Sequence, residues 1–175
     1  VGVYRVTREL GRGGMGVVYE AVHDTIRRQV ALKTLHPRLV HNVEMVLRFQ
    51  NEALAGTMVD DPGIVQISDL GQLDDGTMYF VMECLVGETL AQRMETASKS
   101  TEKGLSLGEC VRLARQIATA MASAHAQGVF HRDLKPSNVM VGEYGQIYLV
   151  DWGLARRKAE LPTRETDDGT MNGTP

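Results

Sequence analysis

The sequence predicts an α+β fold in which a strand-rich first half precedes a second half that begins with a helix. Short β-branched and aromatic runs, separated by turn residues, recur between residues 3 and 83. One segment among them, 42–59, has apolar residues at helical spacing, and so does segment 106–127, which opens the second half.

The first half contains five expected strands and one helix. Residues 3–10 and 17–23 are strand candidates on either side of a glycine cluster, and residues 27–35 form a third. Residues 67–83 contain two alternating runs joined by Asp75-Gly76, which is a hairpin signal. The expected helix has apolar positions that fit one helix face: Val43, Val46, Leu47, Ala53, Leu54 and Met58.

The second half is helical first and then strand-like. Ser106 and Glu109 form a capping-box pattern, and Gly128 is a plausible helix stop. The apolar positions of this helix are Val111, Ala114, Ala118, Met121, Ala122 and His125. Short strands are expected at 138–141 and 146–150, around a turn. Two polar stretches, 95–104 and 157–175, are expected to be loops, and the second is long enough to suggest a functional or disordered segment.

Composition narrows the class of protein. The 175 residues suggest one domain or slightly more, and 43% hydrophobic with 23% charged residues is typical of a globular protein. A formal net charge of −3 gives no general attraction for nucleic acid or an anionic membrane, so no nucleic-acid partner is expected. No apolar run approaches the roughly 18 residues that span a bilayer, and the first residues do not resemble a signal peptide.

These features predict a cytoplasmic segment without a membrane span. Cys84 and Cys110 form no C-x-x-C pair and are expected to be small buried hydrophobic residues, rather than a disulfide or a metal site.

The glycine cluster fits the pattern G-x-G-x-x-G at Gly11, Gly13 and Gly16. The dinucleotide-binding version needs a helix directly after the last glycine, but Val17 and Val18 favour a strand. The glycines are therefore expected in a strand–turn–strand hairpin. Such a turn can bring backbone N–H groups close to phosphate oxygens, or it can be no more than a flexible turn.

Lys33 falls inside the third expected strand, between apolar neighbours. A buried lysine is costly unless it is paired, and Glu52 is the only acid between Val46 and Val59. A Lys33–Glu52 ion pair is therefore expected. Taken alone, Lys33 would be better explained as a strand lysine that extends its charged end into solvent, and the alternative for Glu52 is a solvated helix acid.

The segment His131-Arg-Asp-Leu-Lys-Pro-Ser-Asn138 places Asp133, Lys135 and Asn138 within six residues. Together with the glycine cluster, Val30-Ala-Leu-Lys33, Glu52 and Asp151-Trp-Gly153, it resembles a eukaryotic-type (Hanks-type) serine/threonine protein kinase of the kind also found in bacteria. The motifs occur in the family's order across nearly the whole chain.

The resemblance implies a two-lobed protein-kinase-like fold. Residues 1–85 would form the N-terminal lobe, an antiparallel sheet plus one helix, with the glycine-rich loop, the strand lysine and the hinge. Residues 86–175 would form part of a helical C-terminal lobe, with the catalytic loop, the metal-binding motif and the start of the activation segment. The implied activity is transfer of the γ-phosphate of ATP, with Mg²⁺, to a serine or threonine hydroxyl of a protein substrate.

Roles follow from the resemblance residue by residue. Asp133 would accept the proton of the substrate hydroxyl, Lys135 would neutralise charge on the transferring phosphoryl group, and Asn138 and Asp151 would hold Mg²⁺. Glu52 would orient Lys33 toward the phosphates, and His131 is expected to be structural. The residues implied in nucleotide binding are Leu10, Gly11, Gly13, Gly14, Gly16, Val18, Ala31, Lys33, Met82, Glu83, Leu85 and Met140.

Two departures from the family pattern stand out. The metal-binding motif usually has Phe where this chain has Trp152, and a glycine, Gly56, follows Glu52 by four positions. Our hypothesis is that Gly56 makes room for the indole of Trp152.

In addition, the A-P-E motif and the helices after it do not occur before residue 175. We therefore expect a fragment or a truncated product, weakly active by itself, in which helix 106–127 lacks much of its cover.

Arg132 beside Asp133 is the pattern of kinases that are switched by phosphorylation of the activation segment. Thr163, Thr166 and Thr170 are the candidate sites, with Thr166 favoured. The main alternative function is a nucleotide-binding pseudokinase or scaffold without phosphotransfer, and a dinucleotide oxidoreductase is a distant third.

Overall fold

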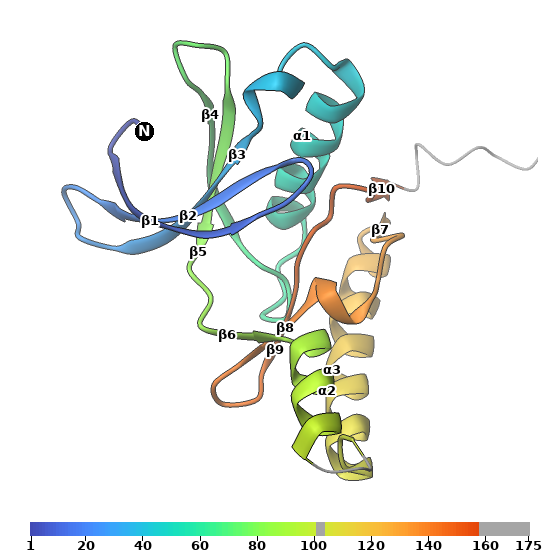
Figure 1. The fold of residues 1–175 in the computed structure, drawn as a ribbon. Helices are drawn as coiled ribbons and strands as arrows, with labels where there is room; N and C mark the ends of the chain where they lie inside the picture. The colour runs from blue at the N-terminus through green and yellow to red at the C-terminus, as the bar shows by residue number, and fades with distance from the viewer. Residues whose placement is uncertain (101–103, 158–175) are drawn as a thin grey trace, which may run out of the picture.

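The computed structural model describes residues 1–100 and 104–157. Figure 1 shows a five-stranded sheet with helix α1 in the upper part of the view, and helices α2 and α3 with a three-stranded sheet in the lower part. A two-stranded sheet lies between them, near the lower end of α1. The α-helices are α1 Val43–Met58, α2 Leu90–Ser100 and α3 Leu107–Ala126. The strands are β1 Tyr4–Arg12, β2 Gly16–His23, β3 Gln29–Leu35, β4 Ile67–Gln72, β5 Met78–Glu83, β6 Gly87–Thr89, β7 Val129–Phe130, β8 Val139–Gly142, β9 Ile147–Leu149 and β10 Arg156–Arg157.

The large sheet is antiparallel throughout, with strand order β1-β2-β3-β5-β4, so the five strands expected in the first half are confirmed. The expected β4–β5 hairpin is also present, and Gly76 adopts φ +84°, a conformation that favours glycine at such a turn. Helix α1 packs on one face of the sheet, where the Phe49 and Phe80 rings lie 4.9 Å apart. This arrangement brings the middle of α1 over β3 and β5.

The buried face of α1 is not the one that the sequence predicted. Its N-terminus is capped as expected for a helix, because the Asn42 side chain accepts a hydrogen bond from Met45 N–H. The expected apolar face is largely exposed, however: Val43 is 73% and Leu47 52% exposed. The residues that are buried are Phe49, Glu52, Ala53, Ala55 and Gly56. The prediction failed because α1 contacts both the sheet and the C-terminal half, and because a charged residue occupies the buried face.

The C-terminal half is built on α3. Ser106 caps the helix by accepting a hydrogen bond from Glu109 N–H, and Gly128 follows the helix with φ +72°, so both expected helix limits are confirmed. The strands expected at 138–141 and 146–150 are present as β8 and β9, which form a three-stranded sheet with β6. The largest core cluster joins α1 residues such as Ala55 to α3, β8 and β9, so it spans both halves, whereas two smaller clusters lie within the first half.

A helix also forms where a loop was expected. Residues 95–100, expected to belong to a polar connector, lie in α2. The signal that was overlooked is a second capping box, in which Gln92 N–H donates to Thr89 Oγ1 and Gln92 Oε1 accepts from Thr89 N–H, at 3.1 and 2.8 Å. Arg93 Nε lies 3.3 Å from Glu88 Oε1 and 3.5 Å from Glu109 Oε1. The second of these ion pairs links α2 to the first turn of α3.

The apolar face predicted for α3 is largely exposed, and the helix buries Leu113, Ala120 and Ala124 instead. Leu107 is 81% and Val111 60% exposed, and Ala114, Ala118 and Ala122 are exposed as well. The two cysteines are both free, but Cys110 is exposed and Cys84 only half-buried, so the expectation of buried cysteines is wrong. In the parts of the chain that the structure describes, no helix has the length and apolar character needed to cross a membrane.

Candidate active site

A cleft of about 660 Å³ lies between the large sheet and the C-terminal half. This volume is within the range of small-molecule sites in proteins. Most of the predicted site residues line it: Leu10, Gly11, Val18, Ala31, Lys33, Glu52, Met82, Glu83, Leu85, Asn138, Met140 and Asp151. Five predicted residues do not line this cleft: Gly13, Gly14, Gly16, Asp133 and Lys135. Lys135 and Asp133 contact each other directly, and Asp133 is connected to the cleft by a hydrogen bond from Asn138, which lines it.

The glycine cluster forms the turn between β1 and β2, as expected. Gly13 N–H donates to Gly16 carbonyl O at 2.9 Å and closes the turn. A side chain at Gly16 would collide with the β3 backbone, because an added Cβ would lie 2.0 Å from Thr34 carbonyl O. At Gly11, Gly13 and Gly14 an added Cβ would meet nothing within 4 Å, so this backbone is open to an approaching group.

The expected Lys33–Glu52 ion pair is present. Lys33 Nζ donates to both carboxylate oxygens of Glu52, at 2.6 and 2.7 Å, and the two side chains are only 14% and 8% exposed. Burial raises the pKa of Glu52, and the lysine charge beside it opposes that rise. Because removal of either partner would leave a buried charge, the pair fixes α1 to β3 at one position.

His131 holds the backbone of segment 131–138 in place from a fully buried position. Its Nδ1 accepts a hydrogen bond from Asp133 N–H at 3.3 Å, so Nε2 carries the proton and donates to Val150 carbonyl O at 3.1 Å. The ring packs on Trp152 with centroids 4.4 Å apart. Burial lowers the pKa of His131, which favours the neutral form. These contacts agree with the expectation of a structural histidine.

Asp133 is held by two neighbours from its own segment. Lys135 Nζ lies 2.7 Å from Asp133 Oδ2, and Asn138 Nδ2 donates to the same oxygen at 3.1 Å and to Asp133 carbonyl O at 2.9 Å. Pro136 begins the 3₁₀ turn, 136–138, that carries Asn138 back to Asp133. The hydrogen bond from Lys135 lowers the pKa of Asp133, so this carboxylate is ionised at neutral pH.

The residues around Asp151 suit a magnesium ion. Asn138 and Asp151 both line the cleft, and the Asn138 amide nitrogen is engaged with Asp133, which leaves its carbonyl oxygen as the ligand atom. Among the described residues no group of three or more His, Cys, Asp or Glu could form an all-protein cage. Mg²⁺ commonly takes only one or two protein oxygens and completes its shell with phosphates and water, so these two residues fit it.

The structure does not support the hypothesis that Gly56 makes room for Trp152. The nearest atoms to an added Cβ at Gly56 belong to Ile67 and Val65, at 2.8 Å from Ile67 Cδ1 and 2.9 Å from Val65 carbonyl O. Trp152 is instead buried against His131, and its Nε1–H donates to Leu149 carbonyl O at 3.2 Å. Gly56 is therefore small because the start of β4 crosses α1 at this point.

Comparison with known sequences identifies the family. A profile described as "Protein kinase domain" matches residues 4–173. The chain belongs to the protein kinase family. It is 37% identical to serine/threonine-protein kinase pkn3 of Myxococcus xanthus, over 95% of this chain and 29% of the relative. It is 34% identical to the probable serine/threonine-protein kinase pknA2 of Bifidobacterium longum, over 99% of this chain and 22% of the relative.

The serine/threonine-protein kinase PknA of Mycobacterium tuberculosis is also 34% identical, over 99% of this chain. The chain spans 39% of the length of that relative. These matches agree with the bacterial Hanks-type kinase that the motifs indicated, and with the α+β fold. The kinase domain described here thus corresponds to a minor part of each of these proteins.

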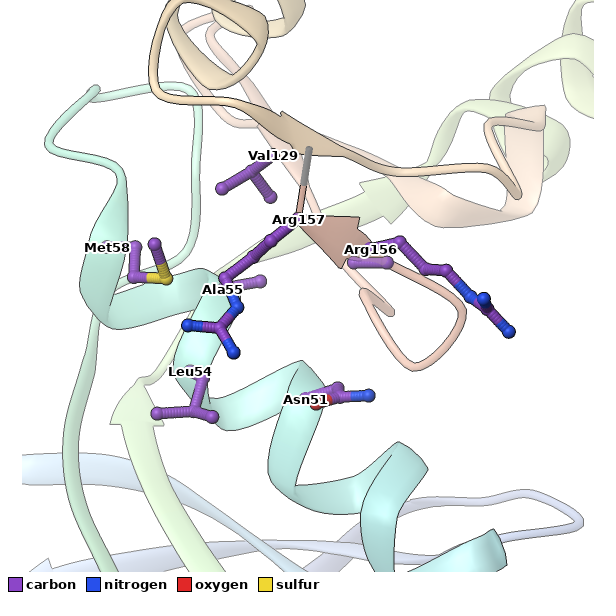
Figure 2. Close-up of a pocket in the computed structure, with 8 residues that line it drawn as sticks. Asn51, Leu54, Ala55, Met58, Val129, Arg156 and Arg157 are labelled. Carbon is purple, nitrogen blue, oxygen red and sulfur yellow. The ribbon is translucent and has the colours of Figure 1, made fainter. Parts of the chain in front are cut away.

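A second cavity of about 350 Å³ is lined by three arginines, Arg48, Arg132 and Arg156, and by one acid, Glu44. Arg48 is ion-paired with Glu44 at 2.6 Å, and the three arginines still make this cavity basic. Figure 2 shows a separate, much smaller pocket between β10 and α1, where Arg157 extends toward Leu54 and Ala55 of α1, whereas Arg156 points the other way. The cavity of about 20 Å³ enclosed between β10 and α1 has room for little more than one water molecule. The candidate sites Thr163, Thr166 and Thr170 lie outside the described residues.

Some residues that line the main cleft were missed by sequence reasoning. Thr89 and Gln92 could have been found through their capping box, and Ser137 through its place inside the catalytic segment. Val65, Ile67, Phe80 and Val150 are ordinary apolar residues, and only the folded arrangement brings them to the cleft.

Proposed function

We propose that this kinase domain transfers the γ-phosphoryl group of ATP, with Mg²⁺, to a serine or threonine hydroxyl of a protein substrate. One observation carries the proposal: Lys33 with its partner Glu52, and the oxygen-bearing Asn138 and Asp151, line one cleft, and Asn138 hydrogen-bonds to the ionised Asp133, which Lys135 contacts. Phosphoryl transfer asks a protein mainly for positioning and charge compensation, and these groups supply both.

The adenine ring is proposed to lie between Val18 and Ala31 on one side and Met140 on the other, because all three line the cleft. The backbone of Glu83 and Leu85 would hydrogen-bond the base, and Leu85 lies between β5 and β6, outside either strand. Met82, which lines the same wall of the cleft, would limit access behind the base. The open backbone of the glycine turn would cover the phosphates.

In the proposed reaction, the substrate hydroxyl oxygen forms a bond to the γ-phosphorus while the bond from that phosphorus to the ADP oxygen breaks. Asp133 accepts the proton of the hydroxyl, and Lys135 compensates charge on the phosphoryl oxygens. When bound at Asn138 and Asp151, Mg²⁺ would neutralise phosphate charge. Lys33, oriented by Glu52, would hold the α- and β-phosphates.

The proposed division of the chain follows the site. Residues 1–85 supply the sheet, α1, the glycine turn and the hinge, and residues 86–175 supply the catalytic segment, the metal ligands and the beginning of the activation segment. The core cluster shared by α1 and the C-terminal half supports coupling between the two parts.

The test is a phosphotransfer assay on the full-length protein with Mg-ATP and a generic protein substrate, in wild type and Asp133→Asn. The substitution is expected to lower kcat by about 10²–10⁴-fold, because general-base catalysis contributes that much, while nucleotide affinity is retained. Wild-type protein that binds Mg-ATP and transfers no phosphate would favour the alternative, a nucleotide-binding scaffold. Equal activity of the two proteins would contradict the role of Asp133.

The basic cavity supports regulation by phosphorylation of the activation segment, with Thr166 favoured over Thr163 and Thr170. Three arginines around one cavity can bind a phosphate dianion through charge-assisted hydrogen bonds. Mass spectrometry after incubation with Mg-ATP should detect phosphate between residues 158 and 175. Phosphate found only elsewhere in the chain would contradict this assignment.

A further inference from the structure

The tip of the glycine turn has few neighbours. A Cβ atom added at Gly13 or Gly14 would meet nothing within 4 Å, so no close neighbour restricts the backbone there. Among the described residues, two hydrogen bonds from outside the hairpin reach it, and both come from His36. Its backbone N–H donates to Met15 carbonyl O at 3.0 Å, and its ring Nε2 lies 3.1 Å from Gly13 carbonyl O. Because a carbonyl can only accept, Nε2 must carry a proton.

The position of His36 follows from the sheet. Leu35 is the last residue of β3 and pairs with Gly16, the first residue of β2, so His36 lies directly beyond the paired strands and next to the turn. Pro37 begins a 3₁₀ turn after it and cannot continue the strand. The chain therefore leaves the sheet at His36, and the imidazole is free to reach back to the glycine turn.

The contact has a directional consequence. All described peptide bonds are trans, and in a planar trans peptide the carbonyl of one residue and the N–H of the next point in opposite directions. A bond from His36 to Gly13 carbonyl O therefore turns the Gly14 N–H away from the β3–α1 connection. The Met15 side chain provides a further anchor, because it packs against the cluster that contains Leu35 and Phe49.

We propose that His36 is a positioning residue. By hydrogen-bonding to the Gly13 carbonyl oxygen, it orients the backbone N–H of Gly14 toward the phosphates of the nucleotide. This inference rests on the proposed function as far as the ligand is concerned. The hydrogen bond itself is present in the protein without nucleotide. A histidine at this position is an unremarkable polar residue in the sequence, and no motif includes it.

Three variants of the full-length protein test the proposal. His36→Phe keeps an aromatic ring and the backbone bond but removes the ring donor. His36→Gln replaces the ring with an amide that can donate. His41→Phe makes the same change as the first variant at an exposed histidine five residues further along the same connection, and serves as the matched control.

Two quantities are measured: the Kd for Mg-ATP, and hydrogen exchange of the amides of Gly13 and His36 without nucleotide. His36→Phe is expected to raise the Kd about 3- to 10-fold, the range that corresponds to one lost hydrogen bond, and to speed exchange at both amides. His36→Gln should recover at least half of the loss on a logarithmic scale, and His41→Phe should match the wild type.

The outcomes separate the two hypotheses. If the wild-type protein does not bind Mg-ATP, the proposed function fails, while the exchange data still decide whether His36 holds the turn. If wild type binds and His36→Phe matches His41→Phe in both measurements, the inference is wrong. If His36→Gln loses as much as His36→Phe, ring packing rather than the hydrogen bond is the cause, and the inference is likewise wrong.

Discussion

Two lysine–carboxylate contacts in the same site have nearly the same length but different surroundings. Lys33 lies 2.6 Å from Glu52, and these side chains are 14% and 8% exposed. Lys135 lies 2.7 Å from Asp133, and these side chains are 50% and 31% exposed. Burial raises the pKa of Glu52, whereas the hydrogen bond from Lys135 lowers the pKa of Asp133.

The difference suits two separate tasks. In a buried ion pair, water cannot replace a lost partner, and separation would leave an unpaired charge. Such a pair therefore holds both side chains in one place. An exposed pair is worth little to stability, so in the proposed reaction Lys135 could leave Asp133 for a phosphoryl oxygen at small cost. We infer that the first pair fixes the geometry of the site and that the second provides its reactivity.

The largest expected effect comes from breaking the buried pair. Lys33→Met leaves the Glu52 carboxylate buried without a partner and should lower the free energy of unfolding by about 3–5 kcal/mol. Lys135→Met should change stability little and act mainly on phosphotransfer. Urea denaturation of the full-length protein at neutral pH measures both. The double variant Lys33→Met/Glu52→Leu should be more stable than Lys33→Met alone, and equal losses for the two lysine variants would contradict the comparison.

A smaller effect is expected from Gly56→Leu, one helical turn after Glu52. The new side chain would collide with Ile67 and Val65, push α1 from β4, and cost about 1–3 kcal/mol of stability. A double-mutant cycle by urea denaturation identifies the partner. Ile67→Ala should recover part of the loss, whereas the effect of Trp152→Phe should simply add to it. Rescue by Trp152→Phe but not by Ile67→Ala would instead favour contact with the indole.

His131 adds a third case, a buried group that is neutral. Because burial lowers its pKa in the folded protein, the unfolded chain takes up the proton first, near the ordinary value of 6.5. Stability should therefore fall as the pH drops below 6.5, by at most about 1.4 kcal/mol for each pH unit. Denaturation midpoints between pH 7.5 and about 5.5 measure the slope. The slope should be flatter in His131→Asn, and an unchanged slope would assign the effect to another group.

The buried pair could be predicted from sequence because the alternatives were so few. Only one acid occurs in the middle of the α1 sequence, and a strand lysine needs a partner. The cluster of Asp133, Lys135 and Asn138 could also be predicted from the sequence, because its members are close along the chain and form a recognised motif. The hairpins and the caps of α1 and α3 follow from local turn and capping chemistry.

The failures share a different cause, since each depends on what a segment packs against. Val43 and Leu47 suit a buried face by periodicity, yet α1 turns Glu52 and Gly56 inward. The role of Gly56 depends on Ile67, which lies 11 positions later, on a strand whose crossing point no local pattern specifies. The contact from His36 to the glycine turn likewise exists only after β2 and β3 have paired.

The smallest effect, and the most direct test of the comparison, is the order in which the two carboxylates take up protons. As the pH falls, Glu52 should titrate first, above its ordinary value of 4.5, and Asp133 last, below its ordinary value of 3.8. The stabilising contribution of the Asp133 contact is complete above 3.8 and is lost as the pH falls through the lowered pKa. For Glu52 the sign is opposite: the folded protein takes up the proton more readily than the unfolded chain, so protonation there favours folding.

Carboxyl ¹³C shifts of the labelled protein report both titrations. Lys33→Met should raise the pKa of Glu52 further, whereas Lys135→Met should return the pKa of Asp133 toward 3.8. If Asp133 titrated before Glu52, the two contacts would not differ in the way that their burial implies.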